Sequence, residues 1–362
     1  MKPNDKAFDF RGVSQIEFSK RLKALRDVVS QDEYEDHLVP LIPSDQRVAV
    51  ERSMSGLTQE DEFAVMSRLM GTAKFLIPLE QAPILGGKPR VPDFLGIFET
   101  TLFDDSVRDT LISTYKCFIE VKSTKQASYR FGGAALERLR DVSRGFAIPL
   151  IFAVRFVQYP THPVWAFVED QGGDKPLEVI TSDFLSGIKK FLWNDTSYWI
   201  EESVSIEMQY SYSFDDRGVS SEKYGHLGRL VLELGSQQWI LEDENVGLVA
   251  MCLKAFNLES DTSETCFDGA IYYQRSRPKR RFVTMVDLVY QINNLAVDDK
   301  GVSIYNPPLL IAKSDKLQED DLISRTEIEQ ILNSLIDIAV IITMTYDELI
   351  DMLGVIANSR RE

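Results

Sequence analysis

The sequence predicts an α/β fold, in which a mixed β-sheet is flanked by helices, followed by a C-terminal region of α+β type. In the first half of the chain, the residue patterns run in the order helix, strand, strand, helix, strand, strand. A chain of 362 residues that is 44% hydrophobic can build two or three domains. A polar stretch around Gly172 and Gly173 indicates a boundary. We therefore expect an N-terminal helical segment over residues 1–54, a sheet domain over 55–172 and an α+β domain over 173–362.

Two amphipathic helices are expected before the sheet. Residues 14–17, Ser-Gln-Ile-Glu, form a capping-box pattern, and apolar residues follow it at helical spacing. Thr58 is placed to cap a second helix, whose apolar stripe includes Phe63 and Met66. Glu62 lies one turn before Met66, at the edge of this stripe.

Four strands and one further helix are expected after these two helices. The turn signal Gly-Gly-Lys-Pro at residues 86–89 precedes the first strand. The helix has one apolar and one basic face, and Gly145 is placed to end it. The expected elements are strands over 91–98, 115–124, 149–156 and 164–168 and a helix over 132–145.

Ionisable residues interrupt two of these apolar strands. Side chains alternate between the faces of a strand, so Glu120 and Lys122 point to one face while Ile119 and Val121 point to the other. A neighbouring strand that carries Asp93 brings a second carboxylate. Burying such charges is costly unless they are paired or hold a metal ion, and we interpret them as a metal site. The alternatives are a strand-start carboxylate at Asp93 and an ion pair between Glu120 and Lys122.

These residues suit the hydrolysis of a phosphodiester. A divalent cation held by oxygen ligands can activate water, neutralise charge on the phosphate and assist the leaving group. The expected ligands are Asp93, Glu120 and the backbone carbonyl of Val121. Lys122 would position the water or offset negative charge. Glu62 could act as a further carboxylate near the ion; its alternative role is to stabilise the N-terminus of its helix.

In this order the residues resemble the PD-(D/E)xK nucleases, which have the restriction-endonuclease-like fold. The resemblance rests on Pro92-Asp93, on Glu-Val-Lys-Ser-Thr at residues 120–124, on the basic helix that follows, on the apolar strand at 148–156 and on a Trp-containing strand after it. It covers less than a third of the chain. Within this superfamily, the chain is most similar to archaeal-type Holliday-junction resolvases and related restriction endonucleases.

The resemblance implies catalysis that depends on Mg²⁺, with Mn²⁺ as the alternative ion. It implies Asp93 and Glu120 as metal ligands, Lys122 as the catalytic lysine and Glu62 as the helix carboxylate. The implied activity is that of a DNA endonuclease, with RNA as the alternative substrate.

About half of this chain follows the nuclease-like region, whereas family resolvases are small single-domain proteins. This difference favours a role in restriction or antiviral defence, in which the C-terminal half selects the target, controls the nuclease or binds a protein partner. Family members often act as dimers, so we expect a homo-oligomer. The alternative function is a non-catalytic DNA-binding or assembly subunit of a larger nucleoprotein complex.

Basic residues near the expected site are candidates for binding nucleic acid. The net charge of −16 opposes such binding, but local charge decides whether a phosphate backbone docks, and basic residues outnumber acidic ones between residues 120 and 160. A second basic run lies at 275–281. The alternatives are a solvated strand end for Lys125, a solvated helix face for the arginines of residues 138–144 and a solvated hairpin tip for the second run. The candidates are Lys125, Arg138, Arg140 and Arg144, and in the second run Arg277, Lys279, Arg280 and Arg281.

Several other classes of protein do not fit the sequence. The 3 cysteines and 3 histidines lack the spacing of a disulfide framework or a zinc site. No glycine-rich nucleotide loop is present, so no ATPase is expected. The first residues precede no apolar segment, and the longest apolar run, near residues 335–344, is about half the roughly 20 residues that a membrane helix needs. We therefore expect a soluble, cytoplasmic protein.

Overall fold

The computed structural model describes residues 15–26, 29–42, 44–79, 90–99, 114–159, 162–172, 176–185, 187–260, 265–267, 271–296, 303–312, 322–344 and 348. Ser14 of the expected capping box, the expected turn at 86–89 and Gly173 lie outside these residues. No helix in the described ranges is long and apolar enough to cross a membrane.

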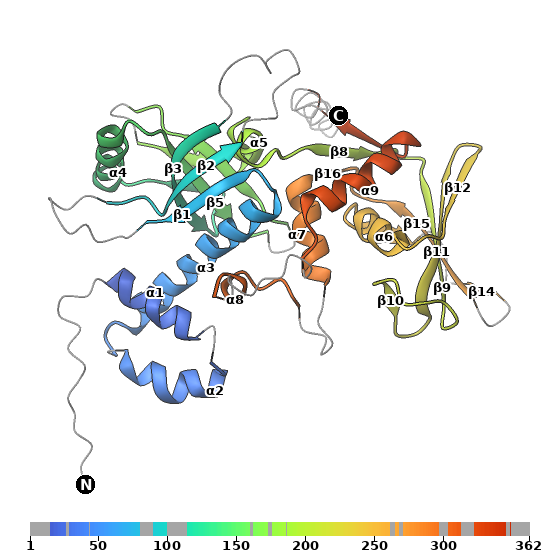
Figure 1. Ribbon diagram of the computed structural model, residues 1–362, viewed down its shortest axis with the longest axis horizontal. Helices are drawn as coiled ribbons and strands as arrows, with labels where there is room; N and C mark the ends of the chain where they lie inside the picture. Colours follow the sequence, from blue (N-terminus) through green and yellow to red (C-terminus); the bar gives the residue numbers. More distant parts are fainter. Residues whose placement is uncertain are drawn as a thin grey trace, which may run out of the picture. The chain divides into compact units, whose positions relative to one another are not determined.

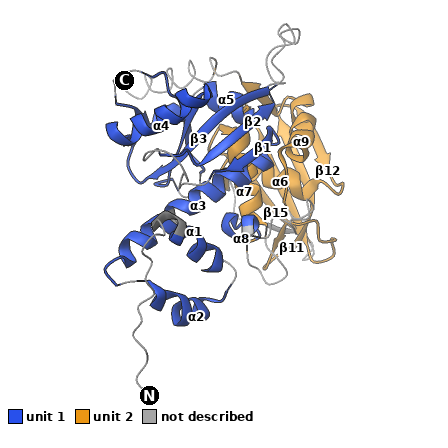
Figure 2. Cartoon of the chain, turned by 60° about the vertical axis from the view of Figure 1, so that its left-hand side comes forward, with its two compact units in different colours: residues 1–194, 304–321 blue, residues 195–303, 322–362 orange. Residues whose placement is uncertain are grey.

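The chain divides into two compact units (Figure 2). The first comprises residues 1–194 and 304–321, and the second comprises residues 195–303 and 322–362. The division therefore falls after Asn194 rather than near residue 172, because the chain beyond 172 continues into the core of the first unit. Whether residues 173–362 have a recognition or regulatory function of their own stays a prediction.

The first unit begins with helices (Figure 1). These are α1 (Gln15–Arg26), α2 (Gln31–Glu33), the π-helical turn η1 (Tyr34–Leu38), the 3₁₀ turn η2 (Val39–Leu41) and the long α3 (Arg47–Leu69). Leu22 of α1 and Val50 and Met54 of α3 share a small buried core, which holds α1 against the first half of α3. α3 begins at Arg47 rather than at Thr58, whose hydroxyl donates to the Met54 carbonyl inside the helix.

A five-stranded mixed sheet follows, and it confirms the expected α/β class. Its strands are β1 (Ala73–Pro78), β2 (Phe94–Glu99), β3 (Thr114–Thr124), β5 (Leu150–Phe156) and β6 (Trp165–Glu169), in the spatial order β1-β2-β3-β5-β6. β3 and β5 are parallel, and the other neighbours are antiparallel. β1 was not expected from the sequence, because it is an edge strand whose exposed and half-buried residues do not alternate.

Helices cover both faces of this sheet. On one face, Phe63 of α3 contacts Phe94, and it also packs against Trp165, Phe167 and Trp193. Trp193 ends α5 (Gly187–Trp193), which explains why residues beyond 172 belong to this unit. On the other face, α4 (Gly133–Phe146) packs Leu136 and Leu139 in a cluster with Phe118, Phe152 and Val154.

Short elements complete the first unit. β4 (Ser128–Arg130) pairs with β7 (Glu178–Ile180), and η4 (Thr181–Leu185) and α8 (Pro307–Ala312) also belong to it.

The second unit is α+β and its strand pairs are antiparallel in the described ranges. One sheet contains β9 (Ser205–Ser211), β10 (Ser220–Ser221), β11 (Gly225–Leu234), β12 (Gln237–Leu241), β13 (Leu258–Ser260), β14 (Thr265–Phe267) and β15 (Ile271–Pro278). The other contains β8 (Ser197–Ile200), β16 (Phe282–Thr284) and β17 (Ile341–Met344). The helices are α6 (Val246–Lys254), α7 (Met285–Leu295) and α9 (Arg325–Asp337).

Candidate active site

The structure brings Asp93, Glu120 and Lys122 together where β2 begins. Lys122 Nζ lies 2.8 Å from Glu120 Oε1 and 3.3 Å from Asp93 Oδ2. It also donates a hydrogen bond to the Val121 carbonyl over 2.5 Å. The three groups that sequence analysis expects as metal ligands thus surround one ammonium group.

The register of β2 and β3 explains this convergence. Phe94 pairs with Ile119 in the antiparallel ladder, so Asp93, one residue before β2, lies beside Glu120 and Val121. The backbone N–H of Val121 donates to Asp93 Oδ2 at 2.7 Å and orients the carboxylate. The pairing of β2 and β3 therefore brings Asp93, Glu120 and Val121 into one site.

Glu120 is the most buried carboxylate of the site, with 1% of its surface exposed. Burial raises the pKa of its carboxyl group, although Lys122 acts in the opposite direction. Its Oε1 contacts both Lys122 and, at 2.9 Å, Arg90. Its Oε2 is buried without a hydrogen-bond partner in the described part of the chain. A buried oxygen of this kind is costly unless it meets a cation or a donor.

Lys122 is held in its charged form. Burial opposes the charge, but Asp93 and Glu120 outweigh this effect and raise the pKa of Lys122 above its ordinary value. The ammonium can therefore donate hydrogen bonds at neutral pH but has no lone pair with which to accept a proton.

The helix carboxylate beside the site is Glu60, not Glu62. Glu60 lines a cavity together with Asp93 and Lys122, and burial, followed by the charge of Asp93, raises its pKa to about 8. Glu62 instead pairs with Arg155 of β5, with 2.9 Å between Glu62 Oε1 and Arg155 Nε. Arg155 and Lys122 lie on opposite faces of the sheet, because Lys122 pairs with Val154, the neighbour of Arg155. Glu62 therefore faces away from the site.

The cavity over the site has a volume of about 570 Å³. Cations from four segments line it, and of these only Lys122 was expected from the sequence. Lys20 and Arg52 lie within the N-terminal segment 1–54 that we expected to precede the sheet domain, and Arg90 precedes β2, so no local motif connects them. The charged residues that line the cavity are Lys20, Arg52, Arg90 and Lys122, with Glu60 and Asp93.

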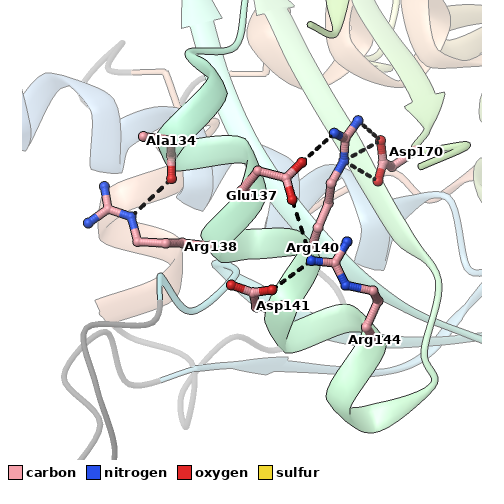
Figure 3. A network of polar contacts seen from close by, with 7 residues as sticks. All are labelled: Ala134, Glu137, Arg138, Arg140, Asp141, Arg144 and Asp170. Carbon is pink, nitrogen blue, oxygen red and sulfur yellow. Dashed lines mark hydrogen bonds and ion pairs between the residues drawn. The ribbon is translucent and has the colours of Figure 1, made fainter. Parts of the chain in front are cut away.

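The basic residues of α4 are largely neutralised (Figure 3). Arg140 is 4% exposed and binds Asp170 through Nη2 at 2.8 Å and Glu137 through Nη1 at 2.7 Å. Arg144 pairs with Asp141 at 2.6 Å and also lies 3.4 Å from Glu137. Arg140 thus ties α4 to Asp170 through a buried ion pair, and its predicted role in binding nucleic acid stays a prediction. Of this group, the exposed Arg138 donates only to a backbone carbonyl, that of Ala134, within the described residues.

The other predicted nucleic-acid ligands have mixed surroundings. Lys125 is exposed in the turn between β3 and β4. In the second basic run, Arg280 pairs with Asp287 at 2.7 Å, Arg281 pairs with Glu202, and Lys279 Nζ lies 3.7 Å from Glu259. Arg277 lies on the exposed part of β15. Carboxylates thus offset much of this run, and its binding role stays a prediction.

The residues of the site are consistent with a divalent cation. No group of three His, Cys, Asp or Glu side chains within the described ranges is arranged to hold a metal ion. The donors present are two carboxylates, Asp93 and Glu120, and the carbonyl of Val121, which are oxygen ligands of the type that Mg²⁺ and Mn²⁺ prefer. The ammonium of Lys122 contacts all three of these groups, and Glu120 Oε2 remains available to coordinate an ion.

Comparisons with known proteins find similarity to a solved structure but not to a protein-family model or a curated protein. No protein-family model matches the sequence, and the comparison with curated proteins finds no match. Part of the chain is similar to Hjc, a Holliday junction resolvase from the archaeal hyperthermophile Archaeoglobus fulgidus. The identity is 18%, the match covers 36% of this chain and 91% of the Hjc chain, and the TM-score is 0.25. The strand order and register described above, and not this match, define the fold of the chain.

Proposed function

We propose that this chain is a nuclease that uses Mg²⁺ or Mn²⁺ to hydrolyse phosphodiester bonds in DNA. The observation that carries the proposal is the convergence of Asp93, Glu120 and the Val121 carbonyl on the Lys122 ammonium. The resemblance of these residues to the PD-(D/E)xK pattern supports it, as does the mixed sheet with helices on both faces.

Each residue has a distinct role in this proposal. Asp93, Glu120 and the Val121 carbonyl would hold the ion, and the N–H of Val121 keeps Asp93 oriented. A bound divalent ion activates water and neutralises charge on the phosphate. Lys122, which remains protonated, donates hydrogen bonds to a phosphate oxygen and offsets the negative charge that develops during attack.

We assign the helix carboxylate of the nuclease site to Glu60 in place of Glu62. Glu60 lines the cavity, and its pKa of about 8 lies close to neutral pH. A carboxylate of this kind can exchange a proton with water in the site, which is the task of a general acid or base.

The experiment is the nicking of supercoiled plasmid by the purified chain in Mg²⁺, Mn²⁺ or EDTA. We expect nicking only with a metal ion, and a loss of about 100-fold or more in Asp93→Asn and Lys122→Ala, the size typical of removing one group that stabilises charge in the transition state. Lys116→Ala is the matched control, because Lys116 is an exposed lysine of the same strand. Equal nicking by wild type and Lys122→Ala would contradict the proposal. Metal-independent DNA binding without any cleavage would favour the non-catalytic alternative.

Several features of the proposal stay predictions. These are the preference for DNA over RNA, a homo-oligomeric state, a partner bound by the C-terminal half, a role in defence and a cytoplasmic location. Parallel assays with single-stranded RNA test the first, and the mass measured by light scattering tests the second.

A further inference from the structure

We propose that Lys20, Arg52 and Arg90 form a wall that binds the phosphate backbone of the strand to be cut. This inference deepens the proposed nuclease function and depends on it for the identity of the ligand. It places the substrate along α1 and the first half of α3, and makes the N-terminal helices part of the substrate site. We refer to these three residues as the basic wall.

The packing of α1 directs Lys20 into the cavity. Lys23 is buried at 6% exposure and forms an ion pair with Asp61 of α3, while Leu22 is buried in the small core between the two helices. Lys20 lies three residues before Lys23, and residues at this spacing share one face of a helix. The buried pair therefore sets the rotation of α1 and aims Lys20 at the cavity.

One face of α3 lines the cavity between Arg52 and the catalytic carboxylates. Ser53, Gly56, Leu57 and Glu60 line it at helical spacing, and Arg52 flanks them at the end far from the sheet. Gly56 leaves open space, since a Cβ at this position would meet no atom within 4 Å. A nucleic-acid strand that reaches Asp93 along this face of α3 passes Arg52 first.

The charges of the basic wall are available for a ligand. Lys20 and Arg52 make no ion pair with any residue in the described part of the chain. Arg90 pairs with Glu120, yet 38% of its side chain remains exposed to the cavity region. In contrast, the α4 arginines Arg140 and Arg144 are bound to carboxylates. In a chain with a net charge of −16, cations gathered over the proposed phosphodiesterase site indicate a polyanion as ligand.

The test is the binding of fluorescein-labelled single-stranded and duplex DNA, measured by fluorescence anisotropy in EDTA, so that cleavage does not enter. The double variant Lys20→Ala/Arg52→Ala should bind at least one of these DNAs about tenfold more weakly. Its log–log salt slope should fall by about one to two units, because each lost phosphate contact removes about 0.9. The control is Lys74→Ala/Lys116→Ala, which removes the same charge from exposed positions on β1 and β3. Equal weakening in the two double variants, or none, would overturn the proposal.

A second pair of variants guards against a fold defect. Gly56→Glu and Gly56→Gln place side chains of equal size in the open space of the cavity, and both residues favour a helix more than glycine does. Gly56→Glu should weaken DNA binding clearly more than Gly56→Gln, because only the carboxylate repels phosphate. Equal affinities of the two variants would contradict the basic wall.

These outcomes are separable from those of the nuclease proposal. Wild-type protein that binds DNA through the basic wall but never cleaves it would refute the nuclease and retain the wall. Protein that nicks plasmid through Lys122 but is insensitive to Lys20→Ala/Arg52→Ala would retain the nuclease and refute the wall.

Discussion

The guanidinium of Arg90 lies 2.9 Å from Glu120 Oε1, the same oxygen that Lys122 contacts at 2.8 Å. A metal ion that binds Glu120, even through Oε2, must therefore lie beside the positive charge of Arg90, and the two cations compete for the charge of one almost fully buried carboxylate. Arg90 itself is partly exposed, so part of its attraction to Glu120 is screened by water.

Arg90→Ala should consequently bind Mn²⁺ more tightly than the wild type. A partly exposed ion pair contributes up to about 1 kcal/mol, which corresponds to an increase of about fivefold in affinity. Isothermal titration calorimetry without nucleic acid measures this, with Lys116→Ala as the control. The same Arg90→Ala protein should bind DNA more weakly, and a metal affinity that is unchanged or lower would disprove the competition.

Glu62 and Arg155 form a buried pair that should matter for stability. Arg155 is 3% exposed, and besides Glu62 it donates to the carbonyls of Phe156 and His162 at 3.1 and 3.2 Å. Removing one partner of a buried pair leaves the other charge uncompensated, at a cost of about 3–5 kcal/mol. Glu62→Ala should therefore lower the free energy of unfolding in urea by an amount of this order.

Two comparisons separate this stabilising role from a role in catalysis. Glu51→Ala removes an exposed carboxylate from the same helix and should leave the urea midpoint nearly unchanged. Folded Glu62→Ala protein should keep the wild-type affinity for Mn²⁺. A loss of metal affinity without a loss of stability would show that Glu62 contributes to metal binding.

Glu60 should make the stability of the metal-free protein depend on pH. Its pKa rises from 4.5 to about 8 on folding, chiefly through burial. Between these values the unfolded chain releases a proton that the folded protein retains, so the stability falls as the pH rises. This contribution is fully present below pH 4.5 and is lost by about pH 8.

Glu60→Gln removes this group, so its urea midpoint relative to wild type should rise steadily between about pH 5 and pH 8 in EDTA. Glu51→Gln, an exposed substitution on the same helix, should follow the wild-type curve. Parallel curves for wild type and Glu60→Gln would show that Glu60 has an ordinary pKa.

Local patterns were sufficient to predict the centre of the site. Glu120 and Lys122 interrupt one apolar strand and Asp93 directly precedes another, and strand alternation and pairing are regular enough to bring these residues together. The mixed sheet was predictable for a similar reason, because β5 is an apolar run, interrupted only by Arg155, that is buried over its whole length.

The surroundings of the site depend on tertiary packing, which no local pattern encodes. Glu60 and Glu62 are two residues apart on α3, and only the rotation of that helix against the sheet decides which one reaches the cavity. Likewise, the basic face of α4 suggested a binding surface. The carboxylate that pairs with Arg140 belongs to Asp170, which lies after β6 and is distant from α4 in the sequence.

Substitution of Arg140 therefore tests whether this residue anchors α4 or binds DNA (Figure 3). Its guanidinium makes a two-pronged contact with Asp170, with Nε 2.9 Å from Oδ2 and Nη2 2.8 Å from Oδ1. Because both side chains are buried, Arg140→Ala should lower the free energy of unfolding by about 3–5 kcal/mol, and Arg140→Lys should recover only part of this, since lysine cannot form the two-pronged contact.

Arg138 is the matched comparison for this prediction, since it lies on the same helix but is exposed. Arg138→Ala should change the free energy of unfolding by no more than about 0.5 kcal/mol. Urea denaturation followed by circular dichroism measures all three variants. If Arg140→Ala proved as stable as wild type and bound DNA more weakly, Arg140 would act as a phosphate ligand, and the helix would be held by its apolar face alone.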